Sequence, residues 1–202
     1  MSGVRYSMSF TTGTLFRNES LKLITLYLEL GDWKAVGIEV CENNTLQART
    51  ISSLKRVSRE IISRLKTLSP KEINLFMALS YQEQGYLLWL AVCRRYRFIA
   101  DFAVEVVRER YLSLKTDLSY EDFDSFFNRK SEWHTKLDEI RPATRHKLRQ
   151  VLFKMLREAD LLTPKNIIIP AVLSPDFIRS IALENRQDFS CFPVFESDLK
   201  DI

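Results

Sequence analysis

Apolar residues recur along most of this chain at the three- and four-residue spacing that puts them on one side of an α-helix. The clearest stretch covers residues 50–68, with the sequence TISSLKRVSREIISRLKTL. Its apolar side consists of Ile51, Leu54, Val57, Ile61, Ile62, Leu65 and Leu68. Only five Gly and six Pro occur among 202 residues, so the chain has few helix breakers. The pattern therefore predicts an all-α protein, folded as a multi-helix globular bundle.

Capping residues mark where several of these helices begin. The sequences SPKE at residues 69–72 and SYED at residues 119–122 are typical helix starts, and Asn44 followed by Gln47 resembles a capping box. Pro142 and the pair Ser174-Pro175 predict two further starts. We expect helices over residues 18–30, 33–41, about 45–68, 70–79, 82–114, from 120, 142–160 and from 175.

Three regions carry more specific expectations. In the first helix we expect a core side made of Leu21, Ile24, Leu28 and Leu30. Residues 82–114 are apolar on nearly every side, which predicts a central helix, either one very long helix or two meeting near Arg95. Its core would include Trp89, Leu90, Phe98 and Phe102. The sequence LLTPKNIIIPAVL at residues 161–173 predicts one small β-hairpin that turns at residues 163–166.

These elements suggest four parts of the chain. Residues 1–12 would be a flexible N-terminus, and residues 13–68 a helix-turn-helix-like subdomain. Residues 69–185 would form a helical C-terminal subdomain with the small hairpin, and residues 186–202 an acidic tail.

Charge changes the picture more than composition does. The net charge of +4 is modest, but the basic residues are segregated. The polar side of the helix in residues 50–66 carries Lys55, Arg56, Arg59 and Lys66, with Ser52 among them and Arg49 close by. The preceding helix, the break at ENN and this helix have the order of a helix-turn-helix, in which Arg reads guanine and Lys holds phosphate.

A second basic helix strengthens this interpretation. Residues 141–157 contain six Lys and Arg and no acidic residue. With Leu148, Val151 and Leu152 toward the core, we expect the basic side chains to be exposed; those that could contact nucleic acid are Arg145, Lys147, Arg149 and Lys154. The alternatives are that both basic faces meet only water or the acidic surface of a partner protein.

Signals for catalysis are weak, and we expect no catalytic residue, no cofactor and no metal site. The two histidines, His134 and His146, fit loop and surface roles, and no phosphate-binding Gly loop or zinc motif is present. Three well-separated cysteines fit a reducing cytoplasm. The longest apolar run, LLWLAVC, ends at Cys93, before Arg94, and is too short to span a membrane.

Several segments resemble the BrxA family, the small proteins of BREX bacteriophage-exclusion systems. They are ESLKLITLYLELGDWKAV, LQARTISSLKRVSREIISRL, YLLWLAVCRRYRFIADFAVEVVRERYL, LSYEDFDSFFNRKSEWH and TRHKLRQVLFKMLREADLL, and the resemblance covers about residues 8–180. It implies a cytoplasmic bacterial protein that works beside a methyltransferase, an ATPase and other BREX components. It also implies similarity to the all-helical nucleic-acid binder NusB. We therefore expect a non-catalytic accessory protein that binds double-stranded DNA, or else a protein adaptor or a NusB-like RNA-binding protein.

Overall fold

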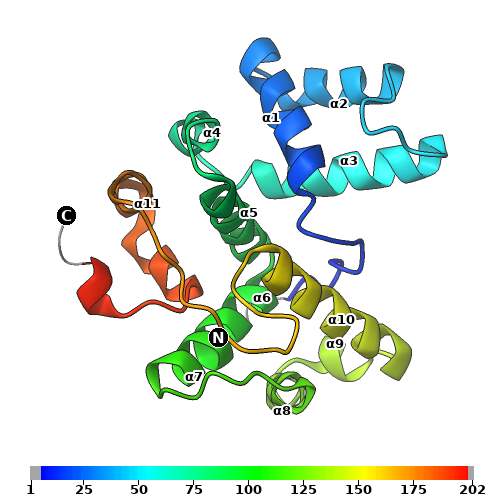
Figure 1. Ribbon diagram of the computed structural model, residues 1–202. Helices are drawn as coiled ribbons and strands as arrows, with labels where there is room; N and C mark the ends of the chain where they lie inside the picture. The colour runs from blue at the N-terminus through cyan, green and yellow to red at the C-terminus, as the bar shows by residue number, and fades with distance from the viewer. Residues whose placement is uncertain (1–5, 200–202) are drawn as a thin grey trace.

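Helix dominates the fold of residues 6–199 (Figure 1). This is the part of the chain that the structure, a computed structural model, describes, apart from the side chains of residues 182 and 184. The α-helices are α1 (Arg17–Leu30), α2 (Trp33–Glu42), α3 (Ile51–Leu65), α4 (Pro70–Phe76), α5 (Tyr81–Arg95), α6 (Arg97–Phe102), α7 (Glu109–Leu112), α8 (Tyr120–Ser131), α9 (Thr135–Asp138), α10 (Pro142–Glu158) and α11 (Pro175–Asn185). The π-helical turn η1 (Ala103–Arg108) joins α6 to α7, and two 3-10 turns follow α11, namely η2 (Arg186–Cys191) and η3 (Glu196–Leu199). The predicted all-α class is confirmed.

Local capping explains where many of these helices begin. Ser69 with Glu72 and Ser119 with Asp122 form capping boxes at α4 and α8, as the sequence predicts. The capping box expected at Asn44 is wrong. Asn44 has a left-handed backbone with a φ of 44°, its side chain binds the backbone of Ala48, and α3 starts only after the cap Thr50.

The centre of the molecule is α5, in which residues 85–93 are all buried. Tyr96 has an extended backbone (φ −124°, ψ 93°), so α5 ends there and α6 begins directly. Of the two alternatives for residues 82–114, two helices meeting near Arg95 is therefore the right one. Trp89, Leu90, Phe98 and Phe102 have 0% exposure, which confirms the predicted core.

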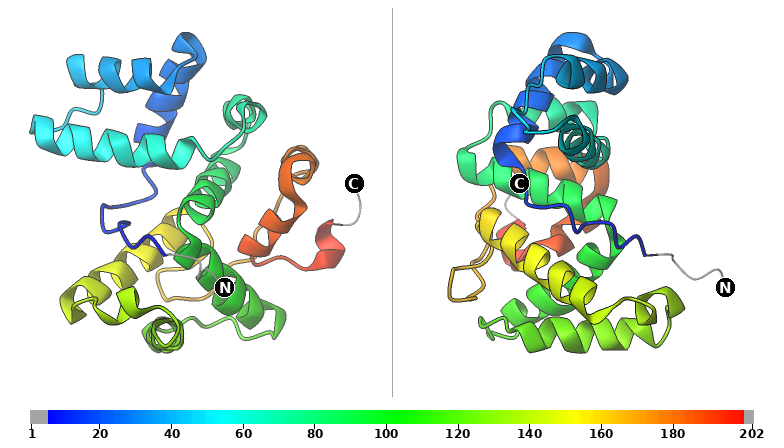
Figure 2. Two further views of the ribbon diagram at one scale, coloured as in Figure 1. Left: turned by 180° about the vertical axis from the view of Figure 1, so that it is seen from behind. Right: turned by 90° about the vertical axis from the view of Figure 1, so that its right-hand side faces the viewer.

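The three N-terminal helices form one end of the molecule. Figures 1 and 2 show α2 and α3 side by side and running in opposite directions, with α1 crossing them. In a helix-turn-helix the two helices cross at a steep angle, unlike the oppositely directed α2 and α3 seen here. The apolar side expected for α1 is partly wrong, because Leu21, Leu28 and Leu30 are 37–45% exposed. Leu23 and Ile24 are the residues of α1 that are fully buried, and Ser20 is buried as well.

Residues on both sides of the expected subdomain boundary at position 68 belong to one continuous core. Leu54, Ile61 and Leu65 of α3 and the apolar residues of α5 lie in the same buried cluster. A shared core does not by itself mark or exclude a subdomain boundary, so the division into residues 13–68 and 69–185 stays a prediction.

Parts of both chain ends pack into the bundle. Phe10 is fully buried and the Tyr6 hydroxyl donates to Asp101 at 2.6 Å, so part of residues 6–12 packs on the bundle. The expectation of a flexible N-terminus stays a prediction, and residues 1–5 lie outside the described part. Residues 196–198 are exposed and the expected acidic tail stays a prediction, but four apolar residues of the segment 186–199 are buried in the core. These are Phe189, Cys191, Phe192 and Val194. Residues 200–202 lie outside the described part.

The expected hairpin is reduced to a tight turn. Leu162 and Ile168 form an isolated antiparallel bridge around residues 163–166, and Asp117 pairs with Ile167 in a second one. The turn is where the sequence places it, but within residues 161–173 no strand extends beyond these single bridges. Instead Leu161, Leu162 and Ile168 are buried in the helical core.

Candidate nucleic-acid interface

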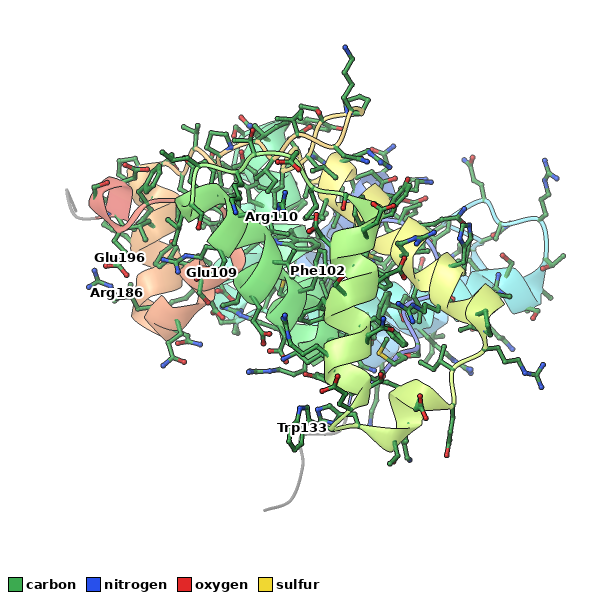
Figure 3. All side chains as sticks on the ribbon, turned by 90° about the horizontal axis from the view of Figure 1, so that it is seen from below. Phe102, Glu109, Arg110, Trp133, Arg186 and Glu196 are labelled. Atoms are coloured by element: carbon green, nitrogen blue, oxygen red, sulfur yellow. The ribbon has the colours of Figure 1, made fainter. Side chains whose placement is uncertain are left out.

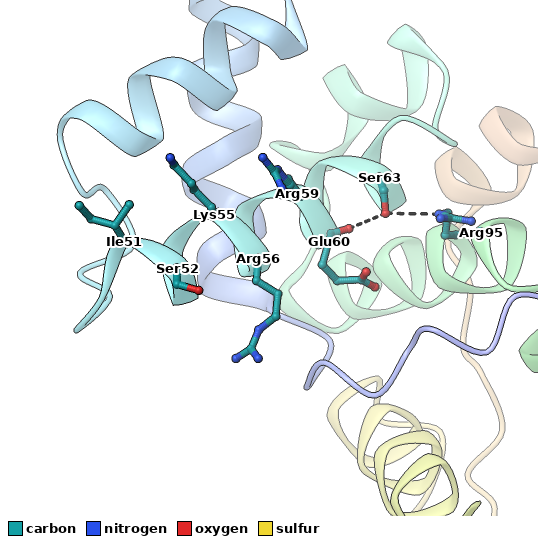
Figure 4. Close-up of a pocket in the computed structure, with 8 residues that line it drawn as sticks. All are labelled: Ile51, Ser52, Lys55, Arg56, Arg59, Glu60, Ser63 and Arg95. Atoms are coloured by element: carbon teal, nitrogen blue, oxygen red, sulfur yellow. Dashed lines mark hydrogen bonds between the residues drawn. The ribbon is translucent and has the colours of Figure 1, made fainter. Parts of the chain in front are cut away.

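The polar side of α3 lines an open groove of about 720 Å³ (Figure 4). The residues that line it are Ile51, Ser52, Lys55, Arg56, Arg59, Glu60, Ser63 and Arg95. Seven of these eight lie between positions 51 and 63, a rise of about 18 Å along the helix axis. The groove therefore follows α3 for most of its length.

The helical repeat explains why these side chains gather on one side. Leu54, Ile61 and Leu65 are buried, which turns α3 so that the positions between them face outward. On this outward side, Figure 4 shows Lys55 and Arg59 pointing toward one edge and Arg56 toward the opposite edge. The structure thus brings together four of the predicted residues, Ser52, Lys55, Arg56 and Arg59.

Glu60 is the carboxylate in the groove lining, and it already binds two other side chains. Glu60 Oε1 accepts from Arg64 Nε at 2.7 Å and from the Tyr96 hydroxyl at 2.6 Å. Arg64 is only 3% exposed and lies beneath the groove, where it compensates the charge of Glu60. Burial and this hydrogen bond to Glu60 raise the pKa of Tyr96 to about 12, so its hydroxyl stays protonated near neutral pH. Among the side chains that the structure describes, Lys55, Arg56 and Arg59 have no carboxylate partner.

Arg95 is a groove residue that sequence reasoning missed. It follows the apolar run of α5, where it looked like the end of a core helix. Its Nε donates to Ser63 Oγ at 3.3 Å, and its guanidinium carbon lies 5.1 Å from the ring centre of Tyr96. Only the packing of α5 across α3 brings it to the groove, and the sequence carries no signal for that contact.

Two other predicted residues of this region lie outside the groove lining. Arg49 is exposed in the loop before α3, and Lys66 is exposed directly after it. Both extend the basic surface at the two ends of the helix.

The second basic helix, α10, differs from the expectation. Arg145 and Arg149 are half-buried rather than exposed, because both pair with Asp124 of α8. Arg145 Nε lies 2.9 Å from Asp124 Oδ1, and its guanidinium also packs over the Phe127 ring at 4.5 Å. Lys154 lies 3.7 Å from Glu158, which leaves Lys147 as the predicted residue of α10 that is exposed and without a carboxylate partner within residues 6–199. Arg145 and Arg149 thus link α10 to α8 through ion pairs.

Chemistry of other kinds finds little support in the described residues. His134 packs against Tyr6 with ring centres 4.3 Å apart, and His146 contacts Arg149 and Gln150 of its own helix. Among the side chains that the structure describes, which do not include that of Glu184, no three of His, Cys, Asp or Glu cluster as metal ligands would. In the same part of the chain, no helix combines the length and apolar character needed to cross a membrane.

Comparisons with known proteins agree on one family. The profile of the BrxA family matches residues 4–185. The chain is 28% identical over 161 residues to "BREX protein BrxA" of Escherichia coli strain HS, which spans 79% of this chain and 76% of that protein. It is 24% identical over 194 residues to a protein of the same name from Paramagnetospirillum magneticum, spanning 94% and 96% of the two chains.

A solved structure shows the same fold. The crystal structure of an uncharacterized protein from Magnetospirillum magneticum superposes with a TM-score of 0.78 at 21% identity, covering 93% of this chain and 98% of the other. Since the family profile spans nearly the whole chain and its relatives carry one name, this protein belongs to the BrxA family.

Proposed function

We propose that this protein is a non-catalytic accessory protein of a bacterial BREX phage-defence system and that it holds duplex DNA through phosphate contacts along the α3 groove. Its relatives are named as BREX proteins, which supports the defence role, and we extend to this chain a cytoplasmic location and other BREX components as partners. The observation that carries the DNA-binding part is the groove itself. It presents Lys55, Arg56, Arg59 and Arg95 with no carboxylate partner among the described side chains.

Unpaired cations support binding to a polyanion for a physical reason. A surface Lys or Arg that pairs with a carboxylate has to exchange that partner for a phosphate, whereas a free cation gains the phosphate and releases condensed counterions from the DNA. Four such cations would contribute a salt slope of up to about −3.6, at about −0.9 per neutralised phosphate on duplex DNA. The groove is wide and open, which favours backbone contact over the reading of individual bases.

The test is duplex binding as a function of salt for Arg56→Ala/Arg59→Ala. We expect the double variant to bind every duplex sequence more weakly, with a salt slope smaller in magnitude by about 1.8. Its melting temperature should stay nearly unchanged, because exposed charges add little stability. Fluorescence anisotropy with a labelled duplex at several salt concentrations measures both quantities.

A matched control removes two arginines on the other side of the molecule. Arg179 is exposed on α11, and Figure 3 shows Arg186 on the side opposite α3. Arg179→Ala/Arg186→Ala lowers the net charge equally and should leave the affinity and slope almost unchanged. If instead Lys147→Ala abolishes binding while Arg56→Ala/Arg59→Ala does not, the contact is on α10 and the groove proposal is wrong. Full displacement of the duplex by RNA of equal length would favour an RNA-binding role, and no salt-dependent binding at all would favour a protein adaptor.

A further inference from the structure

Two adjacent arginines at the end of α5 have opposite environments. Arg94 is bound by two carboxylates, with Glu72 and Asp188 each at 2.7 Å. Arg95, the next residue, has no carboxylate partner within residues 6–199 and lies at the edge of the α3 groove. The first arginine holds the fold together, and the second one is available to a ligand.

We infer that Arg95 is the anchor of the groove, a preorganised phosphate clamp that binds one phosphodiester of the nucleic acid more tightly than the cations of α3 do. This inference rests on the proposed nucleic-acid binding. It assigns the strongest contact to a residue of the central helix and not to the basic helix that the sequence points to.

The position of Arg95 is fixed from three sides. It is the last residue of α5, two positions after the buried residues 85–93, so its backbone is anchored by the core. Its guanidinium stacks near the ring of Tyr96, whose hydroxyl is itself bound to Glu60. Its Nε donates to Ser63 Oγ, and the Ser63 hydroxyl donates to the Glu60 carbonyl oxygen at 2.8 Å, as the dashed lines in Figure 4 show.

The hydrogen bond to Ser63 uses Nε of the Arg95 guanidinium and leaves the two terminal nitrogens, Nη1 and Nη2, for other partners. Within residues 6–199 neither Nη1 nor Nη2 of Arg95 has a hydrogen-bond partner. Two parallel N–H donors match two oxygens of a phosphate, which is the bidentate geometry that arginine forms best. Because these contacts restrain the half-buried Arg95 side chain before a ligand arrives, binding costs less conformational entropy than it does for the exposed Lys55 and Arg56.

Ser63 is the positioning residue in this arrangement. It carries no charge, so it cannot change the number of phosphates that are neutralised. It can only change how well Arg95 is oriented. Charge and orientation can therefore be separated in one experiment, since the salt slope counts charges and the affinity at fixed salt also reports orientation.

The experiment measures duplex anisotropy against salt for Arg95→Ala, Arg95→Lys, Ser63→Ala and the control Arg97→Ala. Arg97 is also an arginine of this region, but it is exposed and pairs with Asp101, so its loss should change neither quantity. Arg95→Ala should weaken binding about tenfold or more and reduce the slope by about 0.9. Arg95→Lys and Ser63→Ala should weaken binding severalfold with an unchanged slope.

Each outcome bears on one claim. If Arg95→Ala binds like the wild type while Arg56→Ala/Arg59→Ala is weakened, the anchor is refuted and the groove proposal stands. If Ser63→Ala and Arg95→Lys both match the wild type while Arg95→Ala is weakened, Arg95 acts only as a charge and the clamp is refuted. If the wild type itself does not bind duplex, the proposed function fails first. Thermal unfolding of each variant shows that it is folded, and Arg95→Lys keeps the test valid should Arg95→Ala be unstable.

Discussion

Replacing Arg94 with Ala should destabilise the fold strongly, because Arg94 joins three parts of the chain. Its Nη1 and Nη2 donate to both oxygens of Glu72 at 2.7 Å, and its Nε and Nη2 donate to Asp188 at 3.0 and 2.7 Å. Nη1 also donates to the Thr67 carbonyl oxygen at 3.0 Å. The Glu72 side chain has 0% exposure, so without Arg94 its charge would lie in the core without its cation.

The size of the effect follows from that burial. Removing one partner of a buried ion pair costs about 3–5 kcal/mol, since the other charge is left uncompensated. Burial alone would lower the pKa of Arg94, but its hydrogen bonds to Glu72 and Asp188 raise it overall, so the guanidinium remains charged throughout the accessible pH range. For a chain of this length each kcal/mol lowers Tm by about 2–4 °C. We expect a loss of about 6–20 °C.

Urea denaturation followed by circular dichroism measures the free energy of unfolding. Arg95→Ala serves as the matched control, because Arg95 is the neighbouring arginine and binds no carboxylate within residues 6–199. Glu72→Gln keeps the side-chain size and removes the charge, and should cost about 1.5–3 kcal/mol. If Arg94→Ala cost less than about 1 kcal/mol, or no more than Arg95→Ala, the assignment of Arg94 to stability would be refuted.

Two further predictions concern other contacts of the bundle. In Tyr96 the folded-state pKa of about 12 exceeds the ordinary value of 10.0, because of burial and the hydrogen bond to Glu60, so the stability from this hydroxyl is complete below about pH 10 and is lost as the pH rises toward 12. At about 1.36 kcal/mol per pKa unit the loss is about 2–3 kcal/mol, and urea denaturation between pH 8 and 11.5 should show a steeper decline for the wild type than for Tyr96→Phe. Ser119→Ala should cost about 1 kcal/mol in thermal or urea unfolding, because Ser119 Oγ accepts from the backbone N–H of Asp122 at 3.1 Å. Ser119→Gly should cost only a few tenths, and equal losses for the two variants would argue against the cap.

Features that depend on neighbouring residues could be predicted from the sequence. A capping box joins positions i and i+3, so SPKE and SYED indicated helix starts that the structure confirms at α4 and α8. The outward face of α3 followed from the helical repeat in the same way, and Lys55, Arg56 and Arg59 do line one groove. That this groove contacts nucleic acid stays a prediction.

Features that depend on contacts between distant residues could not be predicted. Residues 141–157 contain no acid, yet Arg145 and Arg149 are neutralised by Asp124, which lies 21 and 25 positions away on another helix. The position of Asp188 beside Arg94 joins residues 94 positions apart, and it holds the start of the expected tail against α5. In α1 apolar residues occupy more than one side, so spacing alone could not exclude Leu21 and Leu28 from the core.

The contacts of residues 6–17 determine when this segment can pack during synthesis of the chain. The backbone N–H of Leu15 donates to Glu158 at 2.5 Å, and the Arg17 guanidinium bonds to Asp160 at 2.8 Å, contacts that span 143 positions. At a translation rate of about 5–20 residues per second, these partners emerge from the ribosome roughly 7–30 s after the N-terminal segment. This segment is therefore made early but reaches its place late, and Phe10 stays without its buried site until α5 and α6 have been made. A nascent chain stalled before residue 158 would expose this segment to proteases, whereas the finished chain would protect it.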